Sequence, residues 1–290
     1  MAETIAKLLQ KSKIDRRESE LLLSHVLQKT REFIISHPKQ KISKLQEIKY
    51  KALAKKRSRV VPIAYLTGNK EFYGTNFLVN KYVLIPRPET EMIVEEVLSI
   101  LKNKDKTILI DVGTGSGCIP ISVSSALGDS SGTTYKIFAT DISRKAIRIA
   151  KKNAKKHKVK IEFLHGNLLQ PIINKKLLTT HCSLLIVANL PYLTEDQYRS
   201  EPSIQHEPKK ALVARNQGLA LYEKLFKQVR SLISNHQSQI TTIIEIDPSQ
   251  SEAIPNLIKK YFPKTKIEIK KDLAELSRLV IFSIKKNLNK

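Results

Sequence analysis

Tryptophan is absent from the 290 residues, and cysteine and methionine each occur only twice. The two cysteines, Cys118 and Cys182, form neither a CxxC pair nor a disulfide framework, which fits a reducing cytoplasm. No apolar run approaches the roughly 20 residues that a membrane span requires, and the N-terminus lacks the apolar stretch of a secretion signal. The seven histidines show no metal-ligand spacing. We therefore expect a cytoplasmic protein with no metal and no membrane anchor.

Acidic residues are also few: 27 Asp and Glu stand against 51 Lys and Arg, a formal net charge of +24. Such a charge suggests a nucleic-acid or acidic-protein partner, although a Lys-rich solvated surface explains it equally well. The apolar fraction of 41% is enough for a folded core, and the length suggests about two domains. Residues 1–80 carry 17 basic and 7 acidic side chains, a higher charge density than the remainder, which indicates a boundary near residue 80.

The first segment has the apolar spacing of helices. One helix is predicted over residues 14–27, with Asp15 as its N-cap. A second is predicted over 43–57. The apolar face of the first contains Leu22, Leu23, Val26 and Leu27, and that of the second contains Leu45, Ile48, Ala52 and Leu53.

Two short strands are predicted next, at 71–80 and 81–86, interrupted by Gly74 and Asn80. Pro88, followed by Glu89 and Glu91, then suits the first turn of a helix. The predicted domains are therefore a helical unit over 1–68, a β-hairpin linker over 69–84 and a third part over 85–290.

From residue 85 apolar runs alternate with helical segments, which predicts a parallel sheet with helices on both faces. The last two runs are joined without a helix, so an antiparallel pair is expected at the end. The predicted strands are 108–112, 135–139, 160–164, 184–188, 243–246, 266–270 and 279–284.

A glycine-rich loop, Asp111-Val-Gly-Thr-Gly-Ser-Gly117, directly follows the first of these strands. Glycines at alternate positions allow a tight strand-to-helix turn and a close approach of the backbone to a ligand. The candidate ligand contacts are Asp111, Gly113, Thr114, Gly115 and Gly117. An ordinary turn, with Asp111 as a helix-capping acid, is the simpler explanation of the loop taken alone.

Asp141 ends the second strand, where a carboxylate can accept both ribose hydroxyls of an adenosine. It could also merely cap the helix after Ser143. NAD would require glycine at position 118, which is Cys118, and Asp111 would repel a pyrophosphate. S-adenosylmethionine carries cationic sulfonium and ammonium groups instead, so the sequence favours it as the cofactor.

The fourth strand runs into Asn189-Leu-Pro-Tyr192. Methylating an amide or an aryl amine is difficult because the nitrogen lone pair is delocalised. Two acceptors that each take one N–H would orient that nitrogen, and the Asn189 side chain and the Leu190 carbonyl can be these acceptors. Pro191 stiffens the loop, and Tyr192 can stack on a planar substrate group. A chance turn is the alternative for this motif alone.

Together these motifs resemble class I S-adenosylmethionine-dependent methyltransferases, and more specifically the HemK-type protein-glutamine N-methyltransferases. The resemblance extends to Glu18–Leu27, Pro62–Phe72, Ile85–Glu91 and Glu207–Leu212. It implies a Rossmann-like seven-stranded methyltransferase sheet after a helical N-terminal substrate-binding domain. It also implies methylation of the glutamine in the GGQ motif of class 1 peptide chain release factors, and hence a role in translation termination. We expect a monomer with no need for direct nucleic-acid binding.

By the resemblance, the loop glycines would line the methionine end of the cofactor, Asp141 would hold the ribose, and Asn189 to Tyr192 would hold the glutamine amide. Two positions depart from the family pattern. Leu190 replaces the first proline of Asn-Pro-Pro-Tyr, and Asn167 stands where an acid usually meets the adenine amine. An amide oxygen can still accept that bond, so weaker discrimination is expected rather than loss of binding. The segment Ala274–Arg278 departs too far to carry over any role.

Weaker candidates for contacts with substrate or cofactor are Arg87, Glu89 and Glu207, for which surface ion pairs are the simpler explanation. The nine Lys and Arg between Arg144 and Lys160 predict a solvated helix face whose buried side contains Ile142, Ala146, Ile149 and Ala150. His165 and His206 are not expected to act as bases. Two rival functions stay open: an adenine-N6 nucleic-acid methyltransferase, and a non-catalytic RNA- or ribosome-binding module on the same fold.

Overall fold

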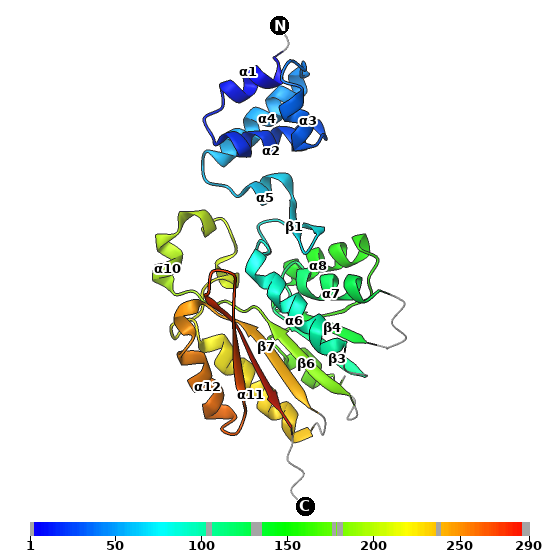
Figure 1. Cartoon of the computed structure of the whole chain (residues 1–290), viewed down its shortest axis with the longest axis vertical. Helices are drawn as coiled ribbons and strands as arrows, with labels where there is room; N and C mark the ends of the chain where they lie inside the picture. The colour runs from blue at the N-terminus through cyan, green and yellow to red at the C-terminus, as the bar shows by residue number, and fades with distance from the viewer. Residues whose placement is uncertain are drawn as a thin grey trace, which may run out of the picture. The chain divides into compact units, whose positions relative to one another are not determined.

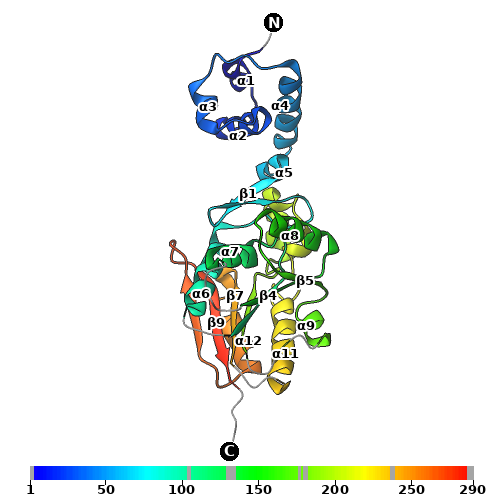
Figure 2. The ribbon, with the colours of Figure 1, turned by 90° about the vertical axis from the view of Figure 1, so that its right-hand side faces the viewer.

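The computed structural model of the chain describes residues 3–102, 106–128, 135–175, 178, 182–235 and 239–285. It divides into two compact units, which are described here one at a time. The first unit is Met1–Asn69 with Glu201–His206, and the second is Lys70–Ser200 with Glu207–Lys290. Figure 1 and Figure 2 show the chain in two perpendicular views, coloured from blue at the N-terminus to red at the C-terminus.

The first unit is a small helical bundle. Polar side chains cap four of its helices: Thr4, Asp15, Thr30 and Ser43 each accept a hydrogen bond from a backbone N–H in the first turn. The predicted Asp15 cap is thereby confirmed, and Leu22 and Leu23 are fully buried in the core of this unit. Its helices are α1 (Ile5–Gln10), α2 (Arg16–Leu27), α3 (Arg31–Ser36), α4 (Lys44–Arg57) and α5 (Ile63–Thr67).

The buried face of α4 differs from the predicted one. Leu45 and Ile48 are 62% and 56% exposed, whereas Tyr50 is buried and Leu53 packs against the core. Two apolar stripes run along this helix, and periodicity cannot choose between them. Packing against α2 selects the stripe that contains Tyr50 and Leu53, which leaves the stripe of Leu45 and Ile48 in solvent.

The second unit begins with a hairpin of β1 (Asn69–Phe72) and β2 (Thr75–Leu78), whose Phe72 and Phe77 are buried. The strand predicted at 81–86 is absent. A turn stands there instead, because the Asn80 side chain accepts from the Tyr82 N–H and the Asn80 carbonyl accepts from the Val83 N–H.

A seven-stranded sheet forms the centre of the second unit, in the order β5-β4-β3-β6-β7-β9-β8. The first five strands in this order are parallel, and β9 runs antiparallel to β7 and β8. This confirms the predicted Rossmann-like sheet with its antiparallel C-terminal pair. The strands are β3 (Thr107–Val112), β4 (Lys136–Asp141), β5 (Glu162–His165), β6 (Ser183–Ala188), β7 (Ile240–Glu245), β8 (Ile267–Lys271) and β9 (Ser277–Ile284).

Helices cover both faces of the sheet, as the alternation predicted (Figure 2). One apolar core joins one face to α9, α11 and α12, and a second joins the other face to α6, α7 and the hairpin. The helices of this unit are α6 (Glu91–Leu101), α7 (Cys118–Leu127), α8 (Arg144–Lys156), α9 (Gln170–Asn174), α10 (Glu195–Ser200), α11 (Ala220–Asn235) and α12 (Ala253–Tyr261). Short 3-10 turns are η1 (Pro88–Thr90), η3 (Lys209–Ala211) and η4 (Pro248–Gln250), while η2 (Pro202–Ile204) lies in the first unit.

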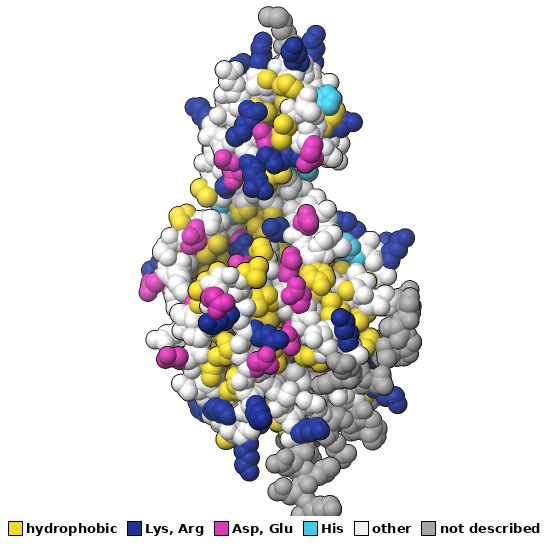
Figure 3. Space-filling model, viewed as in Figure 1, with side chains coloured by type: hydrophobic (Ala, Val, Ile, Leu, Met, Phe, Trp, Pro, Cys, Tyr) yellow, Lys and Arg dark blue, Asp and Glu magenta, His cyan; other side chains and the backbone are white. Residues whose placement is uncertain are grey.

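The basic helix α8 has the predicted solvated face, since every Lys and Arg from Arg144 to Lys160 is exposed. Ala146, Ile149 and Ala150 are buried as expected, but Ile142 is 63% exposed. Ile142 precedes the N-cap Ser143 and therefore lies before the helix rather than on its buried side. On the face shown in Figure 3, Lys and Arg side chains are scattered over both units.

Candidate functional site

The order in which the chain adds strands to the sheet reverses between β3 and β6. From β3 the chain continues through β4 and β5 on one side, and from β6 through β7 on the other. Ligands of open α/β sheets bind at such a switch point, outside the carboxyl ends of the strands. Val112 and Ala188 are partners in neighbouring strands, so the loop after β3 and the loop after β6 leave the sheet together. The predicted glycine loop and the Asn-Leu-Pro-Tyr loop thus share one edge.

The two loops touch through Gly113, which has a positive φ of 79°. A Cβ placed on Gly113 would lie 3.0 Å from the Leu190 Cδ2 and 3.8 Å from the Asn189 carbonyl oxygen. A side chain at position 113 would therefore separate the loops. Gly117, with a φ of 82°, is needed for another reason, since its Cβ would press against α8 at Ala150.

The N–H groups of the glycine loop are used within the protein. Gly113 and Thr114 both donate to the Thr140 carbonyl at 2.9 Å, and Gly117 donates to the Thr114 carbonyl at 2.8 Å. Gly115 donates to Asp141 Oδ2 at 2.9 Å. A phosphate-binding loop offers such groups to its ligand, and these four are already occupied.

Asp141 is held by the backbone on both sides. Its Oδ1 accepts from the Ser143 N–H at 2.7 Å, and its Oδ2 accepts from Gly115. Ser143, not Asp141, caps α8 through the Ala146 N–H. Each carboxylate oxygen has a second lone pair, so this side chain is fixed in place and can still accept hydroxyl donors.

Asp111 is 1% exposed, and neither of its carboxylate oxygens has a hydrogen-bond partner among the described residues. Burial raises its pKa to about 7, against the opposing effect of the nearby Thr114 hydroxyl. The Thr114 hydroxyl is itself buried, and no described residue meets hydrogen-bond geometry with it. An unpaired buried acid is costly to the fold, and a cationic group is the ligand that would relieve it.

Asn167 lies at the same edge, two residues beyond the end of β5, and is half-buried. His165 pairs with Asp141 in the neighbouring strand, and the Gly166 N–H donates to the Asp141 carbonyl at 3.0 Å. The structure therefore brings the glycine loop, Asp141 and Asn167 together along three adjacent strand ends.

The Asn189–Tyr192 loop makes hydrogen bonds to residues that the sequence patterns did not single out. The Asn189 Nδ2 donates to Thr90 Oγ1 at 3.0 Å, and Thr90 donates to Glu245 Oε2 at 2.7 Å. Tyr192 donates to Glu245 Oε1 at 3.2 Å. Tyr222 donates to the Glu245 backbone carbonyl and lies 3.4 Å from the Leu190 carbonyl oxygen. A phenol has one proton, and the closer Glu245 carbonyl takes it.

Two further residues contact the Tyr192 carbonyl at the end of this loop. The buried Gln250 donates to the Tyr192 carbonyl at 3.3 Å. Gly218 has a φ of 82°, and a Cβ there would overlap the Tyr192 carbonyl oxygen. The sequence predicts the strand that contains Glu245 and the helical turn that contains Thr90. No local spacing connects them to Asn189, which is 99 residues from Thr90.

The weaker candidates divide into a pair and a single residue. Arg87 forms an ion pair with Glu207, whose side chain is only 2% exposed and whose Oε2 also accepts from the Ile85 N–H at 2.9 Å. This contact ties the segment before α6 to the loop after α10, which is a structural role. Glu89 is half-buried and contributes to the electrostatic field at Glu245 and Arg278.

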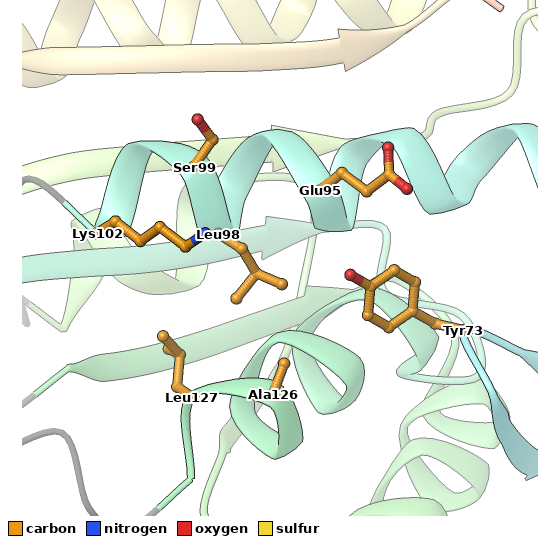
Figure 4. Close-up of a pocket in the computed structure, with 7 residues that line it drawn as sticks. All are labelled: Tyr73, Glu95, Leu98, Ser99, Lys102, Ala126 and Leu127. Carbon is orange, nitrogen blue, oxygen red and sulfur yellow. The ribbon is translucent and has the colours of Figure 1, made fainter.

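A hollow of about 340 Å³ lies between α6 and α7 beside Tyr73, and its lining includes Leu98 and Leu127 but none of the predicted site residues (Figure 4). His165 lies 3.0 Å from the Ile142 carbonyl oxygen and His206 lies 2.9 Å from that of Arg59. Within the described ranges, we find no cluster of three or more His, Cys, Asp or Glu suited to a metal. No helix among the described residues is long and apolar enough to span a membrane.

Two family profiles match parts of this chain. A family profile described as the PrmC N-terminal domain matches residues 2–68, and one described as ribosomal protein L11 methyltransferase matches residues 87–192. A crystal structure of the human Mettl16 catalytic domain with an RNA hairpin has a TM-score of 0.54 and 14% identity, covering 84% of each chain. Such a likeness shows the fold alone. Fold and strand-edge motifs define a Rossmann-like methyltransferase.

The particular family follows from the closer sequence relatives. A release factor glutamine methyltransferase of Bacillus anthracis is 32% identical over 281 residues, covering 95% of each chain. That of Enterococcus faecalis is 38% identical over 222 residues, covering 76% of this chain and 75% of its own. The chain belongs to the family of release factor glutamine methyltransferases.

Proposed function

We propose that this protein transfers a methyl group from S-adenosylmethionine to the side-chain amide of the GGQ glutamine in a class 1 peptide chain release factor. Family membership supports the reaction class. One observation carries the assignment to these residues: the close approach of Gly113 to Leu190 and to the Asn189 carbonyl. This contact supports the proposal, because a cofactor bound at the glycine loop would lie directly beside an amide held by Asn189–Tyr192, as direct transfer between two bound molecules requires.

The residues at the edge fit this cofactor better than a dinucleotide. The loop N–H groups of Gly113, Thr114, Gly115 and Gly117 are occupied, and a pyrophosphate would find none of these four free. The buried carboxylate of Asp111 would meet a cationic ammonium, and Asp141 would accept the ribose hydroxyls. Asn167 would accept the adenine amine. The cofactor supplies a methyl group already activated on a sulfonium.

The substrate amide would be held by two acceptors. Asn189 Oδ1 has no partner among the described residues, and the Leu190 carbonyl competes only weakly for the Tyr222 proton. Each would accept one N–H, which orients the amide nitrogen and favours a pyramidal geometry. Tyr192 would flank the amide, and Pro191 would stiffen the loop. The proton released after transfer can pass to water, so no catalytic base is required.

Leu190 in place of the usual proline does not leave the loop unsupported. Its side chain is 2% exposed and packs over Gly113. Just beyond the loop, the Leu193 N–H donates to the Leu212 carbonyl at 2.9 Å and the Ala214 N–H donates to the Leu193 carbonyl at 3.0 Å. These contacts support a loop that keeps its shape, and we expect the departure at Leu190 to reduce the rate only modestly.

The helical part over 1–68 would bind the release factor, with 69–84 as a linker and 85–290 as the catalytic domain. We propose a cytoplasmic monomer in which Arg87 and Glu89 lie on the substrate side. The scattered positive charge would then steer an acidic protein or ribosomal ligand rather than identify one.

The test is methyl transfer from labelled cofactor to a purified release factor and to the same factor with its GGQ glutamine replaced. We expect label only on the unchanged factor, and about a thousandfold lower rate in Asn189→Ala with unchanged cofactor affinity. Asn256→Ala, at an exposed position of α12, is the matched control. Label on both factors, or on neither, would refute the proposal. Label on DNA or RNA would favour the adenine-N6 alternative, and no affinity for the cofactor would favour the non-catalytic module.

A further inference from the structure

Glu245 is the last residue of β7 and is 2% exposed. It has no ion-pair partner among the described residues, yet it accepts two hydroxyl groups, from Thr90 at 2.7 Å and from Tyr192 at 3.2 Å. Burial raises its pKa to about 7, with Glu89 adding to the rise and the two hydroxyls and Arg278 opposing it. In alkaline solution it is therefore a carboxylate that can only accept hydrogen bonds.

Thr90 connects this carboxylate to Asn189. Its hydroxyl is buried, 2.7 Å from Glu245 Oε2 and 3.0 Å from Asn189 Nδ2. A hydroxyl has one proton, and the carboxylate requires it. What Thr90 offers to Asn189 is then a lone pair, which only the NH2 end of the amide can fill.

The order of donors is thus fixed from Glu245 outward. The Asn189 NH2 group faces Thr90, and its Oδ1 is turned the other way. The two ends of an asparagine amide have nearly the same shape, so packing does not distinguish them and hydrogen bonding must. A flipped amide would present NH2 to the NH2 of a substrate glutamine.

We propose that Glu245, acting through Thr90, is a positioning residue that sets which end of the Asn189 amide faces the substrate. The inference rests on the proposed function, because it is the glutamine amide that needs the oxygen of Asn189. The same carboxylate holds the hydroxyl of Tyr192 at the other end of the loop. One buried side chain therefore fixes both ends of Asn189–Tyr192.

The decisive comparison is between Thr90→Val and Thr90→Ser. Valine keeps the shape of threonine and removes the hydroxyl, whereas serine keeps the hydroxyl. At pH 8.5 we expect kcat to fall about 30-fold in Thr90→Val and less than about threefold in Thr90→Ser, with cofactor affinity unchanged in both. Thr242→Val is the matched control, because the Thr242 hydroxyl on β7 is buried and has no hydrogen-bond partner among the described residues. Its kcat should equal that of the wild type.

A second variant tests the direction of the relay. In Glu245→Gln the amide oxygen can still accept from Tyr192 while the NH2 group donates to Thr90, which allows the Thr90 hydroxyl to reverse and the Asn189 amide to flip. We expect about a tenfold lower kcat in Glu245→Gln, and no further loss when it is added to Thr90→Val, since the path is already broken. Additive losses would mean that Glu245 does not act through Thr90, and would overturn the proposal.

A second readout separates this inference from the proposed function. The side-chain amide signals of Asn189 in an NMR spectrum can be assigned by their loss in Asn189→Ala. They should shift in Thr90→Val and not in Thr242→Val, whatever the enzyme methylates. If the wild type methylates the release factor and Thr90→Val is equally fast, the positioning role is wrong and the function stands. If the wild type transfers nothing, the function fails and the amide signals alone decide the relay, with unshifted signals refuting it.

Discussion

Two buried acids of the helical unit and two buried acids at the strand edge of the second unit have opposite surroundings. In the helical unit, Glu20 lies between Arg16 at 2.8 Å and Arg31 at 2.9 Å. Glu47 lies between Lys51 at 2.6 Å and Lys44 at 3.2 Å. Hydrogen bonds from these cations lower the pKa of both carboxyls.

In the second unit, Asp111 near the end of β3 and Glu245 at the end of β7 are buried at the same edge of the sheet, and neither has an ion-pair partner in the described part of the chain. Burial raises the pKa of each to about 7. The cations of Glu20 and Glu47 shield those carboxylates near the surface, whereas the protein interior itself covers Asp111 and Glu245. The paired acids stabilise the helical unit, whereas the unpaired acids at the strand edge are those for which we propose contacts with a ligand or a neighbouring functional group.

The strongest challenge to this comparison is Asp111→Asn. If the carboxylate is reserved for a cationic cofactor, we expect the affinity for S-adenosylmethionine at pH 8 to fall about 100-fold, which is about 2.7 kcal/mol. Isothermal calorimetry measures it. Glu20→Gln is the control and should leave the affinity within about twofold. Unchanged affinity in Asp111→Asn would mean that this acid is not a cofactor contact.

The dependence of stability on pH should separate the two kinds of acid. A carboxyl whose pKa is raised from 3.8 to about 7 on folding keeps its proton longer in the folded state. Its contribution is complete below about pH 4 and is lost as the pH rises towards 7. Without cofactor, we expect the free energy of unfolding to fall by about 3 kcal/mol over this range relative to that of Asp111→Asn, since each pKa unit corresponds to about 1.4 kcal/mol.

The contribution of the paired acids to stability changes with pH in the opposite direction. Because the pKa of Glu20 is lowered on folding, its contribution is present above about pH 4.5 and is lost as the pH falls below that value. Urea denaturation followed by circular dichroism measures both effects, and the absence of tryptophan makes fluorescence the poorer probe. Equal pH dependence in wild type and Asp111→Asn would show that Asp111 is not unpaired in solution.

A smaller effect is expected from Glu20→Gln at neutral pH. The substitution leaves two arginines without their partner, but both are substantially exposed, with side chains 60% and 38% accessible. We expect a loss of about 1 kcal/mol in the free energy of unfolding. Glu95→Gln, at an exposed position of α6, is the control and should change nothing. If Glu95→Gln lowered the free energy of unfolding and Glu20→Gln did not, the stabilising role of the Glu20 ion pairs would be wrong.

The smallest effect concerns salt. Raising sodium chloride from 0.1 M to 1 M shortens the screening length from about 10 Å to about 3 Å. The difference in unfolding free energy between wild type and Glu20→Gln should shrink by a few tenths of a kcal/mol, about 0.5 at most. That between wild type and Asp111→Asn at pH 8 should not change, because its origin is desolvation rather than attraction between surface charges. Denaturation at the two salt concentrations tests both.

Much of the second unit could be predicted from the sequence because the patterns that define its strands are local. Buried parallel strands are continuous apolar runs, and all seven appear where the pattern placed them, within a few residues. Asp15 caps its helix as its position suggested. The strand predicted at 81–86 does not form, because Asn80 accepts hydrogen bonds from the Tyr82 and Val83 N–H groups and so forms a turn. The prediction of the buried face of α4 was wrong, because two apolar stripes along this helix fit the same helical period.

The order of motifs along the chain determined the sheet and the edge that the glycine loop shares with Asn189–Tyr192, since each motif follows a strand end and parallel strands end together. Tertiary structure alone decided what holds that loop. Thr90, Asn189 and Glu245 meet across 99 and 155 residues, and no periodicity encodes such a meeting. The sequence likewise could not reveal that Asp111 is unpaired while Glu20 is paired. A carboxylate's pKa and use depend on which groups surround it, and folding chooses them.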